Sequence, residues 1–318
     1  MTRFPGRGRF WAILVIAFFC LGGCVSIPNR IAELPAEQSS VELDSTPFYP
    51  QERYQCGPAA LTTVLSFSGV DAALDTITGL TYIPERKGSL QSELLATARS
   101  FERIPYRIEG TLSALAAELT AGRPVLVLQN LGVSWYPRWH YAVVVGIDVA
   151  TGKLTLRSGT DRRRVIDSEV FLRTWQRGSY WAIVLLRPGE LPARPDRDTY
   201  LTAVADFESV AHSQATTLAW EAALQYWPRD PLALFGKASV AFQQGRLEEA
   251  EQNYRLLLAD DPDMYAARNN LAYALARQGR VTEGIEELNK LLGRVAADDP
   301  FREEYEASLR ELESLTGQ

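Results

Sequence analysis

QERYQCGPAALTTVL, residues 51–65, places a cysteine where an apolar helix is expected to begin. Cys56 is followed by Gly57 and Pro58, then by apolar residues at helical spacing, with a stop expected at Gly69. Proline is tolerated in a first helical turn because its missing N–H would be unpaired there anyway. A thiol at this end of a helix lies near unpaired amides and the positive pole of the dipole, which favour the thiolate. The stretch therefore predicts a nucleophilic cysteine.

The first 23 residues have the composition of a secretion signal. Arginines precede an apolar run at residues 10–21, which would cover about 18 Å as a helix and is too short for the roughly 30 Å hydrocarbon core. LGGC at 21–24 resembles a bacterial lipobox, which implies cleavage before Cys24 and lipidation of its sulfur. Ordinary cleavage after Gly23 is the alternative. Val25 replaces the aspartate of inner-membrane retention, so the resemblance implies a lipid anchor in the outer membrane, facing the periplasm.

The anchored chain would keep a single free thiol, Cys56, because Cys20 would leave with the signal and Cys24 would be lipidated. Structural burial of that thiol is the alternative to catalysis. With 318 residues, 46% of them hydrophobic, the chain is long enough for two domains. Its formal charge of −6 becomes −9 without the three signal arginines, which disfavours nucleic acid as a partner.

The composition divides the chain after the signal into four parts. Residues 24–46 are polar and patternless and predict a tether, and 188–198 are rich in proline and charge and predict a linker. Between them, 47–187 contains helix patterns followed by strand patterns, which predicts an α+β domain with an antiparallel sheet. One helix is expected to begin at Cys56. Two more are expected at 90–101, with Ser89 as a possible N-cap, and at 112–120, after Thr111. The expected strands are 125–130, 139–147, 153–158, 163–166 and 180–186.

Residues 199–318 predict an all-α domain with an internal period of 34. The period separates Pro228 from Pro262 and Gly245 from Gly279. It resembles tetratricopeptide repeats, which implies binding of a protein partner or substrate, although Gly284 replaces the usual alanine. Coincidental helical hairpins are the alternative. A weaker unit covers about 197–228, and 301–315 predicts a terminal capping helix.

His140 is the candidate general base. It opens HYAVVVGID, where alternation along a strand places it on one face with Ala142 and Val144. A lone histidine on an apolar strand is usually structural, but pairing with an isolated thiol favours catalysis. The other histidine, His212, lies in the weak helical unit and is interpreted as a surface or packing residue. Gln51, five residues before Cys56, is the candidate side-chain donor to an oxyanion, with a surface position as the alternative.

A family resemblance covers nearly all of residues 47–187. Its motifs are Gln51 with CGPA at 56–59, then KGSLQSELLATA, GRPVLVLQN and HYAVVVGID. Together they resemble the papain-like peptidases that cut double-glycine leaders from bacteriocin precursors, most closely their stand-alone exported relatives. The resemblance implies a papain-like fold in which cysteine attacks the carbonyl, histidine transfers the proton and glutamine stabilises the oxyanion. It implies no cofactor.

The residue that orients the histidine departs from that family pattern. Relatives place aspartate or asparagine on the next strand, where it would hold the imidazole Nδ1–H. Here Ser158 occupies the position, and a hydroxyl stabilises imidazolium less than a carboxylate does. Asp161 is the alternative, because a simple hairpin turning at about 150–151 would set it opposite His140. Asp148 is less suitable, since eight strand residues separate it from His140 by about 26 Å.

Other sequence features narrow the function. Trp135, Tyr136, Trp139 and Tyr141 flank the histidine, and packing against the sheet is favoured over a role as walls of a peptide cleft. The sequence has neither a glycine-rich phosphate loop nor a metal-binding cluster of cysteine and histidine. We therefore expect a membrane-anchored cysteine peptidase acting on a peptide or protein. A catalytically weak or inactive peptide-binding scaffold is the alternative.

Overall fold

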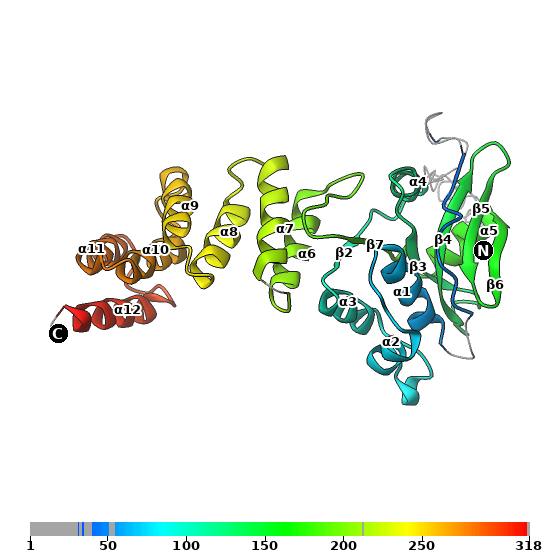
Figure 1. The fold of residues 1–318 in the computed structure, drawn as a ribbon, viewed down its shortest axis with the longest axis horizontal. Helices are drawn as coiled ribbons and strands as arrows, with labels where there is room; N and C mark the ends of the chain where they lie inside the picture. The colour runs from blue at the N-terminus through cyan, green and yellow to red at the C-terminus, as the bar shows by residue number, and fades with distance from the viewer. Residues whose placement is uncertain (1–30, 32–33, 35–39, 51–54, 212, 317–318) are drawn as a thin grey trace, which may run out of the picture.

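The computed structural model describes residues 31, 34, 40–50, 55–211 and 213–316 (Figure 1). Its N-terminal part is built on a seven-stranded sheet with the order β2-β7-β3-β4-β5-β6, and β1 pairs with β4. Every strand pair in the sheet is antiparallel, which confirms the predicted α+β class. The strands are β1 Ser40–Glu42, β2 Ile104–Arg107, β3 Val125–Asn130, β4 Trp139–Asp148, β5 Lys153–Ser158, β6 Asp161–Asp167 and β7 Ala182–Leu186.

Helices cover both faces of the sheet. Along β4, Tyr141 and Val143 pack into a hydrophobic cluster with α1, whereas Ala142 and Val144 pack on the opposite side. The helices on the first face are α1 Cys56–Phe67, α2 Leu74–Thr81 and α3 Gln91–Ser100, with a 3-10 turn η4 at Pro84–Arg86. Those on the second are α4 Leu112–Thr120, α5 Ser168–Gln176 and α6 Arg197–Glu208.

Residues 40–46 belong to the domain and not to a tether, so the predicted boundary at residue 47 is wrong. Ser40 pairs with Asp148 and Glu42 with Gly146. The cause is an open edge: β3 pairs with β4 only as far as Val144, which leaves the backbone beyond it without partners until β1 supplies them. Of residues 24–39, only Ile31 and Leu34 are described.

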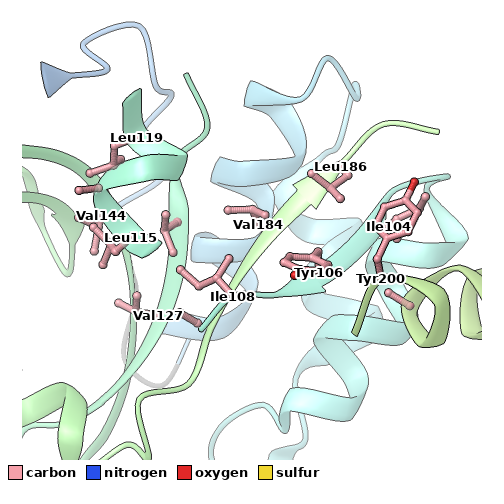
Figure 2. Close-up of a cluster of buried hydrophobic side chains, with 14 of the residues drawn as sticks. Ile104, Tyr106, Ile108, Leu115, Leu119, Val127, Val144, Val184, Leu186 and Tyr200 are labelled. Atoms are coloured by element: carbon pink, nitrogen blue, oxygen red, sulfur yellow. The ribbon is translucent and has the colours of Figure 1, made fainter. Parts of the chain in front are cut away.

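The predicted linker at 188–198 is also wrong, because this segment packs on the first domain. The Ala193 amide donates to buried Glu118 at 2.7 Å, and the Asp196 amide donates to the Tyr106 hydroxyl at 3.0 Å. Helix α6 then begins at Arg197 and adds fully buried Tyr200 to the cluster around β2 (Figure 2). The same cluster continues into α7, so the two regions share one hydrophobic core.

Paired helices follow, as the 34-residue period predicts, and Figure 1 shows them leading away from the sheet. Gly245 and Gly279, with φ of 75° and 81°, lie just after α8 and α10, where left-handed backbone ends a helix. A methyl group on Gly284 would lie 2.6 Å from the Ala272 carbonyl oxygen, which explains why glycine replaces alanine there. The helices are α7 Ser213–Tyr226, α8 Pro231–Gln243, α9 Leu247–Asp260, α10 Tyr265–Arg277, α11 Val281–Leu292 and α12 Arg302–Leu315.

No helix in the described part of the chain is both long enough and apolar enough to cross a membrane. The predicted signal peptide at 1–23, the lipidation site Cys24 and His212 lie outside the described residues. Their assignments therefore stay predictions.

Candidate active site

Cys56 is the first residue of α1, as the sequence predicts. The first helical hydrogen bond runs from the Ala59 amide to the Gln55 carbonyl at 3.2 Å, so the amides before it are free of helical partners. The backbone N–H groups of Cys56, Gly57 and Tyr141 donate toward the sulfur and lower the thiol pKa. Burial has the larger effect and raises that pKa above its usual value. The thiol is therefore protonated at neutral pH.

Gly57 is required by a close approach of the loop between α2 and α3. A methyl group at this position would lie 2.7 Å from both Cβ and Oγ of Ser89. The Tyr141 hydroxyl donates to the Ser89 carbonyl at 3.3 Å and ties the same loop to β4. Ser89 is thus a wall residue beside the thiol and not the cap of α3, which begins after Leu90 with no side-chain cap. Its buried hydroxyl has no hydrogen-bond partner among the described residues.

His140 is the second residue of β4, opposite Gln129 of β3. Its Nε2 is 2.8 Å from the Ser158 hydroxyl, so the residue in the family position contacts the ring. The predicted contact at Nδ1 is wrong, because the serine occupies Nε2 and leaves Nδ1 for other partners. Burial is the main reason that the His140 pKa falls to about 4, and the positive charges of Arg164 and Arg138 lower it further.

Asp161 does not contact the imidazole, because the strand register shifts and the chain turns into β6 after Ser158. Asp148 pairs with Lys153 as a simple hairpin requires, but a bulge between Val144 and Gly146 moves the pairing by one residue. Because of this shift and the turn into β6, Asp161 is not the residue opposite His140. That residue instead starts β6, pairs with Ser158 across a tight turn and is exposed.

Both candidate catalytic residues open into one cleft of about 1330 Å³. Its walls come from the loop before α3, the loop between β3 and β4, and the turns after β5 and α5. Tyr136 and Trp139 line it with 67% and 56% of their surface exposed, so the favoured interpretation that they pack against the sheet is wrong. Tyr141, by contrast, is buried. The sulfur and the imidazole thus border the same space, although 84 positions separate them in the chain.

Some predictions about the site are untouched by this geometry. Gln51 lies outside the described residues, so its oxyanion role stays a prediction. In the described part of the chain, histidine, cysteine, aspartate and glutamate side chains form no group of three or more that could hold a metal ion.

The basic residues of the cleft were not predicted from the sequence; they are Arg86, Arg107 and Arg138. The only indication of a basic cleft in the sequence is that Arg138 lies next to Trp139, one of the aromatic residues that flank His140.

Family models match the sheet-containing part and the helical part of the chain separately. Residues 43–183 match the Peptidase_C39 like family, and residues 218–263 and 241–303 match two Tetratricopeptide repeat models. The chain has a C39-like peptidase domain followed by tetratricopeptide repeats. The boundary of the C39-like match at 43 agrees with a domain that begins before residue 47. This domain contains Cys56, His140 and Ser158.

Several solved structures are similar to parts of the chain. A protein described as a C39-like peptidase from Bacillus anthracis is 16% identical, with a TM-score of 0.39, over 47% of this chain and 98% of its own. A double glycine motif protease from an AMS/PCAT transporter, in complex with the leader peptide, is 19% identical, with a TM-score of 0.33, over 44% and 89%. The type III secretion translocator chaperone SycD of Yersinia enterocolitica is 13% identical, with a TM-score of 0.36, over 39% and 90%. No curated protein gives a significant match.

Ser158→Ala should slow the reaction of Cys56 with a peptidyl electrophile about fivefold, because one hydrogen bond that fixes the imidazole is worth roughly 1 kcal/mol. Asp161→Ala is the matched control and should leave the rate unchanged. The rates are measured by intact mass spectrometry of the purified chain. Equal rates for Ser158→Ala and the parent would show that the contact at Nε2 does not position the ring for reaction.

Proposed function

We propose that the chain is a cysteine peptidase in which Cys56 is the nucleophile and His140 the general base. The observation that supports this most strongly is the shared cleft, which is bordered by a thiol at the start of α1 and an imidazole held at Nε2 by Ser158. A nucleophile, a base and a residue that orients the base are the parts that such a mechanism requires. The match to the C39-like family agrees with this chemistry.

The charge state of the site defines how the reaction would start. Cys56 has a raised pKa and His140 a lowered one, so the resting pair is a neutral thiol and a neutral imidazole. The proton would pass from sulfur to His140 as the sulfur attacks the carbonyl carbon. The backbone N–H at the start of α1 and the Gln51 side chain would stabilise the oxyanion. His140 would then protonate the leaving amine, and water would hydrolyse the thioester.

The rest of the chain would anchor this domain to a membrane and bind a partner or the substrate. Lipidation of Cys24 would anchor the protein in the outer membrane with its domains in the periplasm, and the motif at 21–24 is the support for this part of the proposal. The repeats would bind a protein partner or the substrate, because stacked helical pairs form extended binding surfaces.

A second candidate function is an inactive or weak peptide-binding module. Two observations favour it: a serine in place of a carboxylate at His140, and charges from Arg138 and Arg164 that disfavour imidazolium. Both would weaken a thiolate–imidazolium pair, but neither removes the general-base route from neutral groups.

A thiol-directed peptidyl probe should separate the two candidates. We expect covalent labelling of Cys56 in the purified chain, and labelling at least about tenfold slower in His140→Ala, because proton removal assists attack. His212→Ala replaces the other histidine and should label like the parent. Absence of labelling, or labelling independent of His140, would favour the inactive module.

The pH dependence of labelling gives an independent prediction. His140 acts as a base only when neutral, so the rate should fall on acidification with a midpoint near pH 4, where the imidazole gains its proton. Well above neutral pH the rate should rise again, as the thiol, whose pKa is raised, begins to ionise. Labelling reactions that are stopped at fixed times across the pH range measure both the fall and the rise of the rate. An acid midpoint at the ordinary histidine value of about 6.5 would show that burial and the two arginines do not control the ring.

A further inference from the structure

The walls of the cleft around Cys56 are basic. Arg86 comes from η4 before α3, Arg107 ends β2 and Arg138 comes from the loop between β3 and β4, with Lys87 beside Arg86. Among the described residues that line the cleft, none is an aspartate or a glutamate. The chain as a whole, by contrast, has 39 acidic and 33 basic residues, and residues 199–318 include 20 acidic and 11 basic ones.

The three arginines are not neutralised by the described acidic side chains. Other arginines are paired, as Arg163 is with Glu42. Arg86, Arg107 and Arg138 are exposed and occur in none of the ion pairs of the described chain.

The charge of Arg138 also reaches the catalytic residue, since Arg138 is one of the charges that act on the His140 ring. Positive charge without an acidic partner among the described residues, on three separate walls of a concave site, produces a local field that attracts anions.

Apolar and aromatic side chains also line the cleft. Leu128 and Trp181 border it from buried positions, and Tyr136 and Trp139 stand exposed beside Arg138. Aromatic side chains provide a large contact area to a peptide at low cost in conformational entropy. The same cleft thus combines contacts for side chains of any type with charges that discriminate between them.

We propose that the cleft selects acidic peptides, with aspartate or glutamate close to the bond that Cys56 attacks. This substrate class rests on the proposed peptidase function and specifies its substrate. The acidic repeats do not oppose the selection at working ionic strength, because salt of about 0.1 M screens charges beyond about 10 Å. Arginine suits the role because its fork of N–H groups binds a carboxylate through two parallel hydrogen bonds.

An anionic lipid headgroup would also be attracted to arginines, but the geometry favours a peptide. The charges lie on the inner walls of the cleft that contains the thiol, and they come from three elements that surround it. A membrane contact would need a convex face or a helix with charges along one side.

Two peptidyl vinyl sulfones test the proposal, identical except that one carries glutamate residues where the other carries glutamine. The rate of Cys56 labelling is measured on the full chain by intact mass spectrometry. At about 0.1 M salt the glutamate probe should label about tenfold faster than the glutamine probe, and the ratio should approach one at about 1 M salt. Arg86→Glu combined with Arg138→Glu should reduce the low-salt ratio to one or below.

Arg310→Glu is the matched control, since it makes the same charge change at an exposed position of α12 outside the cleft. It should preserve the ratio. A low-salt ratio of one in the parent chain, or a loss of the ratio in Arg310→Glu as large as in the cleft variant, would overturn the proposal. Binding to vesicles of about one-third anionic phospholipid that needs Arg86 and Arg138, together with a probe ratio of one, would overturn it in favour of a membrane contact.

The glutamine probe keeps the two proposals separable. If it labels Cys56 in a His140-dependent manner while the ratio stays at one, the peptidase function stands and the acidic substrate class fails. If neither probe depends on His140, the peptidase function fails, and the substrate class fails with it.

Discussion

Cys56→Ala should lower peptide hydrolysis by about a thousandfold or more, because removing the nucleophile of a covalent mechanism removes most of its rate enhancement. The thiol begins α1 and accepts backbone N–H groups from both α1 and β4. An alanine keeps the helix and removes only the sulfur. Release of new amino termini from a mixed pool of acidic peptides measures the effect, with the full chain and the variant at equal concentration.

His140→Ala should lower the same rate by about two orders of magnitude or more, since it removes the base and the donor to the leaving amine. His212→Ala serves as the control for loss of a histidine as such and should hydrolyse like the parent. Circular dichroism spectra should agree among all three variants and the parent. Equal turnover by Cys56→Ala and the parent would contradict the peptidase proposal outright.

Tyr200→Ala should reduce the free energy of unfolding by about 3–5 kcal/mol, the usual cost of deleting a large buried aromatic side chain. Tyr200 is fully buried, and its ring lies 6.4 Å from that of Tyr106 and 5.8 Å from that of Trp227. Its hydroxyl donates to the Glu190 carbonyl at 3.0 Å. The residue therefore joins β2 of the C39-like domain to α6 and the end of α7, and Figure 2 shows it in the cluster with Ile104 and Tyr106.

The two regions should respond together because they share that core. Urea unfolding is followed by helical circular dichroism and, separately, by the accessibility of Cys56 to a small thiol reagent. Both transitions should shift to lower urea in Tyr200→Ala. Tyr226→Ala, at a position 52% exposed, is the matched control and should cost less than about 1 kcal/mol. A shift confined to the helical signal would show that the C39-like domain is stable without α6.

Regular elements with a strong period are predictable from this sequence, and short or half-hidden ones are not. The helix that starts at Cys56 and the strands at 125–130 and 153–158 agree with the structure at both ends or nearly so, because apolar spacing and flanking glycines define them. Strand β1 was hidden in polar sequence, since it mainly pairs with the β4 backbone and only Val41 of its three residues packs against the core. The segment at 188–198 has linker composition, yet buried partners such as Glu118 hold it in place.

At the site, residue types were predictable, whereas their detailed contacts were not. The sequence indicates Cys56, His140 and Ser158, and the structure brings the first two to one cleft and the third to the imidazole. The bulge at 144–146 and the turn into β6 after Ser158 together remove Asp161 from the position opposite His140, and no sequence period reports either. The basic walls were missed for a similar reason: they come from three loops and strand ends that meet only in the fold.

A crystal structure of the chain with a peptidyl aldehyde tests the catalytic pair most directly. We expect a hemithioacetal on Cys56, with its oxygen within hydrogen-bond distance of the Cys56 backbone N–H and the His140 imidazole beside the sulfur. An aldehyde bound away from Cys56, or a His140 ring that faces away from the adduct, would contradict it.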